Sequence, residues 1–175
     1  MNPLNLPGPV RQIGYLVRDI DAAIAWWVRM GIGPWYVIRE IALKTRYRGQ
    51  PCEVVQTIAL ANSGEMQIEL IQQHGDTPSV YTEFLTARGE GFHQFAWWVK
   101  DFDAAIAAAE QAGFPVVWSS AEPGGVQFAY VEPPGGPVPI IEIMELNEVT
   151  EGMAALVRGA AQDWDGTDPV RSLTG

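Results

Sequence analysis

The sequence predicts an α+β protein made of two tandem modules, each with the element order strand, helix, strand, strand, strand (βαβββ). The first observation behind this prediction is an internal repeat, because residues 17–25 (VRDIDAAIA) return as residues 99–107 (VKDFDAAIA). The second is an alternating apolar pattern ahead of each copy and a helical pattern within it. The third is a set of three strand-like segments after each helix. Two copies are too few for a solenoid, so they predict two packed halves of one globular body.

The first module begins with a strand over residues 11–18, and Asp19 then stands where a helix N-cap belongs. Apolar residues recur at helical spacing until Gly31, which ends the helix as a glycine just beyond the last turn does. Loops rich in Gly, Pro, Asn and Ser separate the segments that follow. Three strands are predicted there, over residues 35–42, 53–60 and 65–72.

The second module repeats this order. A strand is predicted over residues 92–100, Asp101 is the expected N-cap, and Gly113 ends the helix. Three further strands are predicted over residues 116–119, 126–131 and 138–144.

The domain organisation follows from these two modules and the segments around them. A helix is predicted over residues 150–164, followed by a loose tail over residues 165–175. The expected parts are an N-terminal arm (1–9), the first module (10–76), a linker with a short helix (77–90), the second module (91–146), and a C-terminal helix and tail (147–175).

Composition excludes several classes of protein. Apolar residues make up 47% of the 175-residue chain, which is too many for a disordered protein, and no apolar run is long enough for a membrane span. The net charge of −10 argues against nucleic-acid or anionic-membrane partners. Cys52 is the single cysteine, so no disulfide forms within the chain. A signal-peptide pattern is lacking as well, and we expect a cytoplasmic protein.

Three stretches of sequence resemble the vicinal oxygen chelate superfamily, which includes glyoxalases, bleomycin-resistance proteins and dioxygenases. They are residues 12–19 (QIGYLVRD), 67–72 (QIELIQ) and 89–96 (GEGFHQFA), and the last, with residues 78–81 (PSVY), is most similar to the methylmalonyl-CoA epimerase-like branch. The resemblance covers residues 10–146. It implies that the eight strands form an incomplete barrel whose concave side holds a metal. Many chemistries occur on this scaffold, so the resemblance predicts the fold more specifically than the activity.

The resemblance also implies where the metal ligands lie, on the first and fourth strands of each module. The four implied positions are Gln12, Glu69, Gln94 and Glu142. The residues give independent support to Glu142, which shares a strand face with two apolar neighbours and is costly to bury without a partner. Glu69 and Glu142 are therefore the candidate catalytic carboxylates.

The chain departs from the family at two of these positions, because many relatives carry His where it has Gln12 and Gln94. Imidazole suits Zn, Co and Ni, whereas amide oxygen suits Mg, Ca or Mn better. A divalent cation (Mg, Mn, Ca, Co, Ni or Zn, not distinguished) and a metal-free site both stay open. Oxygenase chemistry at Fe(II), which needs two His and one carboxylate, is not expected. Of the two histidines, His74 is expected in a loop, and His93 points away from Gln94 unless a bulge intervenes.

Aromatic residues are the candidates for binding the substrate. Trp98 shares its strand face with Gln94 and is expected on the concave side. The further candidates are Trp35, Tyr36, Trp118 and Tyr130. An aromatic cavity with a carboxylate pair suits a small, largely apolar substrate with one polar reactive centre.

Two functions of different class remain open. One is an isomerase, epimerase or lyase in which a Glu of raised pKa removes a proton next to a carbonyl group. The enolate would then be stabilised by a divalent cation or by the amides of Gln12 and Gln94. The other is a metal-free binding protein that sequesters a ligand, as bleomycin-resistance proteins do. A relative that has lost its site is a third possibility, and the resemblance implies a homodimer in each case.

Overall fold

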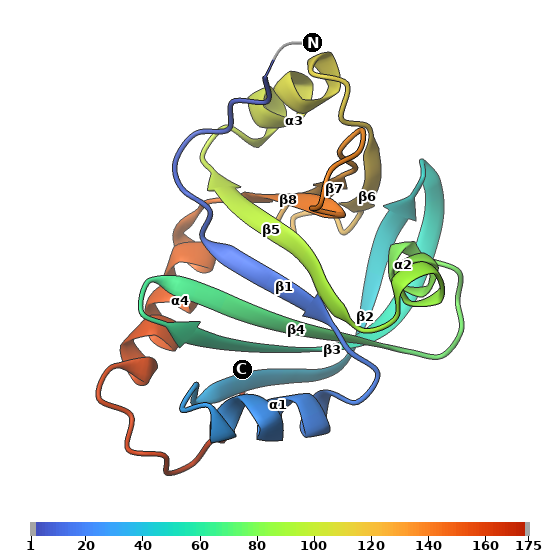
Figure 1. Ribbon diagram of the computed structural model, residues 1–175. Coiled ribbons are helices and arrows are strands. Elements are labelled where there is room, and N and C mark those ends of the chain that lie inside the picture. Colours follow the sequence, from blue (N-terminus) through green and yellow to red (C-terminus); the bar gives the residue numbers. More distant parts are fainter. Residues whose placement is uncertain (1–2, 174–175) are drawn as a thin grey trace.

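The computed structural model describes residues 3–173 and contains four helices and nine strands (Figure 1). The strands of the first module and its helix come first, then a linker helix, the second module, and a C-terminal helix and strand. The elements are β1 (Gln12–Leu16), α1 (Ile20–Arg29), β2 (Trp35–Tyr47), β3 (Gln50–Ser63), β4 (Met66–His74), α2 (Val80–Arg88), β5 (Gly91–Val99), α3 (Phe102–Gln111), β6 (Val116–Ser120), β7 (Phe128–Val131), β8 (Ile140–Glu145), α4 (Glu148–Ala161) and β9 (Val170–Ser172).

Eight of the strands form one closed ring. Their order is β3-β4-β1-β5-β8-β7-β6-β2, and β2 returns to pair with β3. The β2–β6 pairing, which closes the ring, joins three residue pairs from Thr45↔Ser120 to Tyr47↔Trp118. We call this pairing the seam. The predicted α+β fold with tandem βαβββ modules is confirmed, and the barrel closes within one chain.

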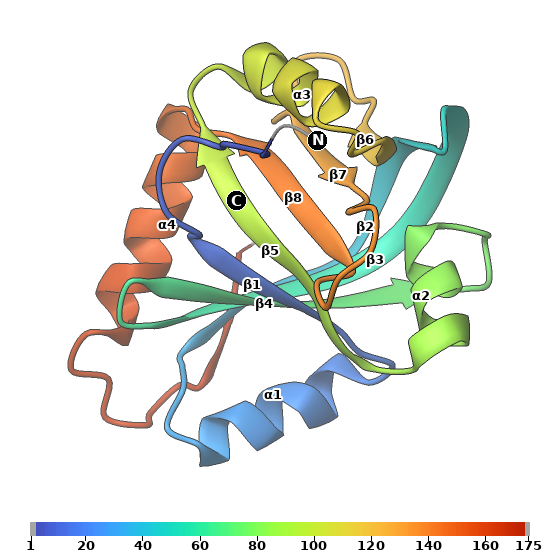
Figure 2. The same cartoon turned by 45° about the horizontal axis from the view of Figure 1, so that its top comes forward.

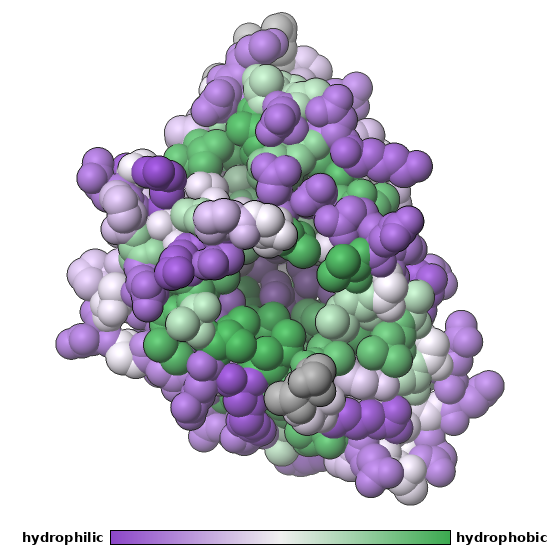
Figure 3. Space-filling view, turned by 180° about the vertical axis from the view of Figure 1, so that it is seen from behind, coloured by the Kyte–Doolittle hydropathy of each residue, from purple (hydrophilic) through white to green (hydrophobic). Residues whose placement is uncertain are grey.

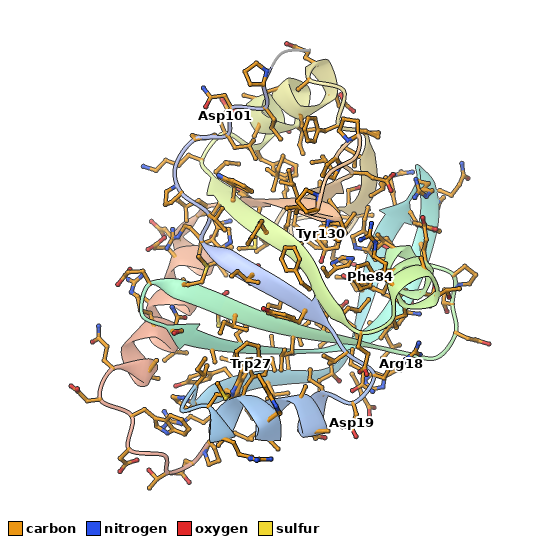
Figure 4. All side chains as sticks on the ribbon, in the orientation of Figure 1. Arg18, Asp19, Trp27, Phe84, Asp101 and Tyr130 are labelled. Carbon is orange, nitrogen blue, oxygen red and sulfur yellow. The ribbon has the colours of Figure 1, made fainter. Side chains whose placement is uncertain are left out.

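Helices α1 and α3 cover equivalent outer faces of the two modules. Asp19 and Asp101 cap them as predicted, accepting hydrogen bonds from the backbone N–H of Ala22 and Ala104 at 2.9 and 3.0 Å (Figure 4). Ile20 and Ile24 of α1 are buried against strands β2 to β4, and Trp27 packs beside them. Buried alanines of α3 pack in the same way on β5, β7 and β8. The sequence repeat is therefore a structural repeat.

The other two helices lie at opposite sides of the barrel (Figure 2). Tyr81 and Phe84 of α2 belong to the core cluster that fills the barrel interior at one end. On the other side, Val157 of α4 packs with Tyr36 and Leu60, and Ala154 packs with Trp98. The space inside the barrel is thus bounded by α2 at one end and by α4 at the side.

The structure differs from the sequence prediction in two ways. The β2–β3 hairpin extends to Tyr47 and Gln50, whereas the sequence predicted a loop between residues 42 and 53. The two strands stay paired over this stretch, and the end of β2 gains β6 as a second partner. The segment over residues 165–175, expected to be a loose tail, contains β9, which pairs in parallel with Trp35–Val37. Trp164 anchors it, since a Cβ atom on Gly33 would lie 2.6 Å from this indole ring. Residues 174–175 lie outside the described part.

Helix length and hydropathy give no candidate for a membrane-spanning helix among residues 3–173.

Candidate functional site

The barrel surrounds a cavity of about 260 Å³. It opens on the side opposite the view of Figure 1, as the hollow in Figure 3 shows. Figure 3 shows this opening as a hollow with hydrophobic residues around it and hydrophilic residues deep inside. Its surface comes from β1 to β5, β7 and β8, and from helices α2 and α4. Most of it is apolar, and the apolar side chains include Ile41, Leu43, Ile58, Leu60, Ile71, Phe128, Met144, Val149 and Met153.

Two carboxylates meet at this cavity, Glu69 from β4 and Glu142 from β8. Both contact the same amide group, which belongs to Gln94 on β5. Gln94 Nε2 donates a hydrogen bond of 3.0 Å to Glu69 Oε2 and one of 3.2 Å to Glu142 Oε2. Three of the four predicted positions are therefore in direct contact, although they are far apart in the sequence.

The strand order explains this convergence. β4, β1, β5 and β8 are neighbours in the sheet, and Gly14 of β1 is the register partner of both Glu69 and Gln94. A Cβ atom on Gly14 would lie 2.3 Å from Gln94 Cδ and 2.4 Å from its Nε2. The missing side chain at Gly14 thus leaves the space through which Gln94 reaches both carboxylates.

Burial changes the acidity of both carboxyl groups. Loss of hydration raises the pKa of Glu142 to about 7, and the hydrogen bond from Gln94 opposes this rise. Loss of hydration, together with the nearby charge of Glu142, raises the pKa of Glu69 well above 4.5. Two close carboxylates titrate as one system, and the pair keeps a proton near neutral pH.

Gln12, the fourth predicted position, lies at the cavity but does not join the carboxylate pair. Its Nε2 donates a hydrogen bond of 2.8 Å to Gln67 Oε1 on the neighbouring strand. Its Oε1 is buried and has no hydrogen-bond partner within residues 3–173, and the same holds for Gln56 Oε1 and for Trp98 Nε1. All three side chains line the cavity. Such groups are costly unless a ligand or water satisfies them.

Two of the five predicted aromatic residues, Trp98 and Tyr130, lie at the cavity surface. The other three lie elsewhere, and the expectation that they line it is corrected here. Trp35 is buried under α1 and donates to Ile32 O at 3.0 Å, whereas Tyr36 packs with Val157 of α4. Trp118 is buried in the core cluster that contains Tyr81 and Phe84 of α2. Trp35 and Tyr36 are neighbours on β2 and point to opposite faces, so which aromatic residues reach the cavity depends on how the helices pack and not on alternation alone.

Tyr81 is a cavity residue that the sequence analysis did not single out. Its hydroxyl lies 3.2 Å from that of Tyr130, and both rings line the cavity. Burial raises the pKa of both phenols, so they stay protonated and can donate hydrogen bonds. The sequence feature that could have indicated Tyr81 is Ser79. It forms a capping box with Thr82 and so fixes the start of the helix that carries Tyr81.

Neither of the two histidines lies at the cavity surface. His74 ends β4, half-buried, with Nε2 2.7 Å from Thr57 Oγ1. His93 is fully buried, and its ring packs against Phe84 and Tyr130. Burial lowers its pKa to about 4, so the imidazole is neutral.

A divalent cation, one of the two alternatives that the sequence leaves open, does not fit these residues as they are oriented. Gln94 presents its amide nitrogen, a donor, to both carboxylates, and a cation requires oxygen ligands there. Gln12 likewise directs its nitrogen to Gln67. Within residues 3–173, no three or more His, Cys, Asp or Glu side chains are grouped so that they could hold a metal ion. The arrangement suits a pair of carboxyl groups that shares protons.

Comparison with solved structures gives the same fold at low sequence identity. A hypothetical protein from Bacillus halodurans C-125 is 23% identical, with a TM-score of 0.58 over 80% of this chain and 95% of that one. The methylmalonyl-CoA epimerase of Mycobacterium tuberculosis is 22% identical, with a TM-score of 0.54 over 81% and 89%. That of Streptomyces coelicolor, in complex with 2-nitronate-propionyl-CoA, is 19% identical, with a TM-score of 0.56 over 80% and 95%. At these identities the likeness concerns the fold alone.

Sequence comparison assigns the family. No curated protein matches the chain. Residues 11–130, more than half of the chain, match the sequence profile of the Glyoxalase/Bleomycin resistance protein/Dioxygenase superfamily. With the duplicated βαβββ barrel, this match shows that the chain belongs to the Glyoxalase/Bleomycin resistance protein/Dioxygenase superfamily.

Proposed function

We propose that the protein is an isomerase, epimerase or lyase that removes a proton next to the carbonyl group of a small, neutral, largely apolar substrate. The observation that carries this proposal is the carboxylate pair of Glu69 and Glu142, held by one amide at the surface of an otherwise apolar cavity. Carboxyl groups with a raised pKa are suited to general acid and base catalysis near neutral pH.

The two carboxyl groups have different protonation states in this proposal. Glu142, with a pKa of about 7, is the base that takes the proton from the carbon next to the carbonyl. The electron pair of the broken C–H bond moves to the carbonyl oxygen and forms an enolate. Glu69 is protonated at the start and donates its own proton to the other face of that carbon or to a more distant carbon, while Glu142 holds the proton it removed; this gives epimerisation or isomerisation. In a lyase, the enolate instead expels a group from the neighbouring carbon.

The enolate oxygen needs a hydrogen-bond donor at the cavity surface. Gln94 uses both hydrogens of its NH2 group on the two carboxyl groups, and Gln12 uses one of its two on Gln67. The hydroxyl pair of Tyr81 and Tyr130 has one proton that its internal hydrogen bond does not use. This hydroxyl is the donor we assign to the developing negative charge, because a fixed donor in a dry site stabilises it strongly.

The charge of the cavity selects the substrate class. Among the described residues that line it, none is Lys, Arg or His. A substrate carboxylate would meet two acidic groups without a compensating cation, which is unfavourable in an apolar enclosure. A neutral ketone or aldehyde meets no such penalty. Coenzyme A esters are disfavoured, since their phosphates would find no basic residues at this surface.

Hydrogen–deuterium exchange tests the proposal without knowledge of the natural substrate. We would incubate the protein in D2O with neutral cyclic and branched ketones and measure deuterium at the α-carbon by mass spectrometry. The expected result is protein-dependent exchange that falls at least about 100-fold in Glu142→Gln. The control is Glu145→Gln, on the same strand but outside the cavity.

The same assay separates catalysis from sequestration. Ligands that bind, as judged by NMR line broadening, yet show no exchange with any ketone would contradict the enzyme and favour the binding protein. Equal exchange by the native protein and by Glu142→Gln would contradict the assignment of the base.

A further inference from the structure

The strand β5 contains a bulge beside the carboxylate pair. In the β1–β5 ladder Gly14 is the partner of Gln94, but the next residue, Tyr15, is the partner of Phe92. His93 is therefore the extra residue without a partner. Such a bulge breaks the alternation of side chains, so two consecutive residues can turn to the same side. Both His93 and Gln94 are fully buried inside the barrel.

The bulge brings these two neighbouring side chains into contact. His93 Nδ1 is within hydrogen-bond distance of Gln94 Oε1. An amide oxygen only accepts, so Nδ1 must carry the hydrogen in this neutral imidazole. The other end of the same amide, Nε2, donates to Glu69 and Glu142. One chain of hydrogen bonds thus runs from His93 through Gln94 to both carboxylates.

We propose that His93 is a positioning residue, which fixes the Gln94 amide so that a neutral NH2 group, in the place of a cation, links Glu69 and Glu142. The inference rests on the proposed function, because it concerns the same carboxylate pair. It assigns a role to a buried histidine that touches neither the cavity nor the reacting atoms.

Reversal of the amide shows why the histidine matters. If Gln94 turned by 180°, its oxygen would face two carboxylate oxygens and its NH2 group would face the Nδ1–H of His93. Two donors would then meet at the imidazole, and only the protonated carboxyl of the pair could donate to the amide oxygen, so the reversed amide makes fewer hydrogen bonds in this buried environment. A donor at Nδ1 therefore selects one of the two amide orientations.

The surroundings keep the imidazole in this position. Its ring centroid lies 4.9 Å from that of Phe84, 5.6 Å from Tyr130 and 5.9 Å from Tyr81. His93 Nε2 is buried and has no hydrogen-bond partner among the described residues. Nε2 is thus unsatisfied in either tautomer and favours neither, so the contact of Nδ1 with Gln94 Oε1 determines the tautomer.

Nitrogen-15 NMR of the full chain tests the tautomer directly. The chain has two histidines, and His74→Gln identifies which signals belong to His93. The expected spectrum has a hydrogen on His93 Nδ1 and a bare Nε2. A hydrogen on Nε2, or rapid averaging between the two tautomers, would overturn the proposal.

A pair of variants then tests the positioning. His93→Phe keeps an aromatic ring against Phe84 and Tyr130 but removes the donor. We expect the side-chain NH2 hydrogens of Gln94 to exchange with solvent at least about tenfold faster, because the amide is no longer fixed. Phe84→Leu is the matched control, since it removes a ring contact of His93 without removing a hydrogen bond to Gln94. His93→Asn, which retains a donor, should restore part of the protection.

The outcomes distinguish this inference from the proposed function. Unchanged Gln94 exchange in His93→Phe, or the same acceleration in Phe84→Leu, would overturn the positioning role. If the spectra agree with the proposal but no ketone exchanges deuterium, the positioning stands and only the catalytic function fails.

Discussion

Gly14 and Gln94 face each other across the β1–β5 ladder, and a Cβ atom at position 14 would stand 2.3 Å from Gln94 Cδ. Gly14→Ala should therefore push the Gln94 amide away from both carboxylates. We expect a loss of about 1–3 kcal/mol in the free energy of unfolding, measured with urea, as for other overpacked interiors.

Gly152→Ala is the control for this substitution. Position 152 lies in α4, and a Cβ atom added there would meet nothing within 4 Å, so a methyl group should stabilise the helix by up to about 1 kcal/mol. Similar effects of the two substitutions would contradict the role of Gly14.

The raised pKa of Glu142 predicts a dependence of stability on pH. Burial raises this pKa from 4.5 to about 7, so the folded state holds the proton more tightly than the unfolded state. The resulting stability is fully present below pH 4.5 and is lost as the pH rises through about 7, with a total of about 3 kcal/mol.

Urea unfolding of Glu142→Gln at pH 5 and pH 8 measures this contribution. The variant should gain stability relative to the native protein at pH 8, and the gain should shrink at pH 5 because the native side chain is protonated there. Glu145→Gln, outside the cavity, should show no such difference between the two pH values. A gain for Glu142→Gln that is equal at both would be evidence against a buried carboxylate.

The hydroxyl pair of Tyr81 and Tyr130 predicts non-additive substitutions. Tyr81→Phe and Tyr130→Phe each leave one buried hydroxyl without its 3.2 Å partner, and each should cost about 1–2 kcal/mol. The double variant should cost less than the sum by about 1 kcal/mol. A double-mutant cycle of urea unfolding checks this, and strictly additive losses would show that the hydroxyls do not interact.

The pairing of β9 with β2 predicts that the C-terminal segment contributes to stability. Removal of residues 165–175 deletes β9, exposes the edge of Trp35–Val37 and removes the acceptor of the Trp164 Nε1–H bond, which is 2.6 Å long. We expect the free energy of unfolding to fall by about 1–3 kcal/mol. Val170→Ala, which keeps the backbone pairing, should change it little, because this side chain is half-exposed. No loss on truncation would mean that β9 is not needed for stability.

The fold was predictable because the same βαβββ pattern occurs in both halves of the sequence. Asp19 and Asp101 begin equivalent helices in both modules, and a cap followed by a helical apolar stripe is a local signal. The pairing of β9 was not predictable in this way. It joins three residues to a strand more than a hundred positions away, and nothing in a three-residue segment encodes its partner.

The candidate site was predictable in part. The alternation around Glu142 indicated a carboxylate among apolar neighbours, and the structure places that carboxylate at the cavity. The contact of His93 with Gln94 could not be predicted, because the bulge depends on how β5 pairs with β1. The inward face of Trp98 followed from alternation. Trp35 and Tyr36 are adjacent and point to opposite faces of β2, and their burial against α1 and α4 depends on tertiary packing that alternation does not encode.

The seam has a consequence for how the two halves of the polypeptide depend on each other. β2 of the first module closes the ring on β6 of the second, and each module contributes one acidic group, Glu69 or Glu142. A fragment that ended in the linker before α2 would carry half of the acid–base pair and an open, aggregation-prone sheet edge. The two modules are therefore incomplete when separated, and complementation of the two fragments would be needed to regain the enclosure.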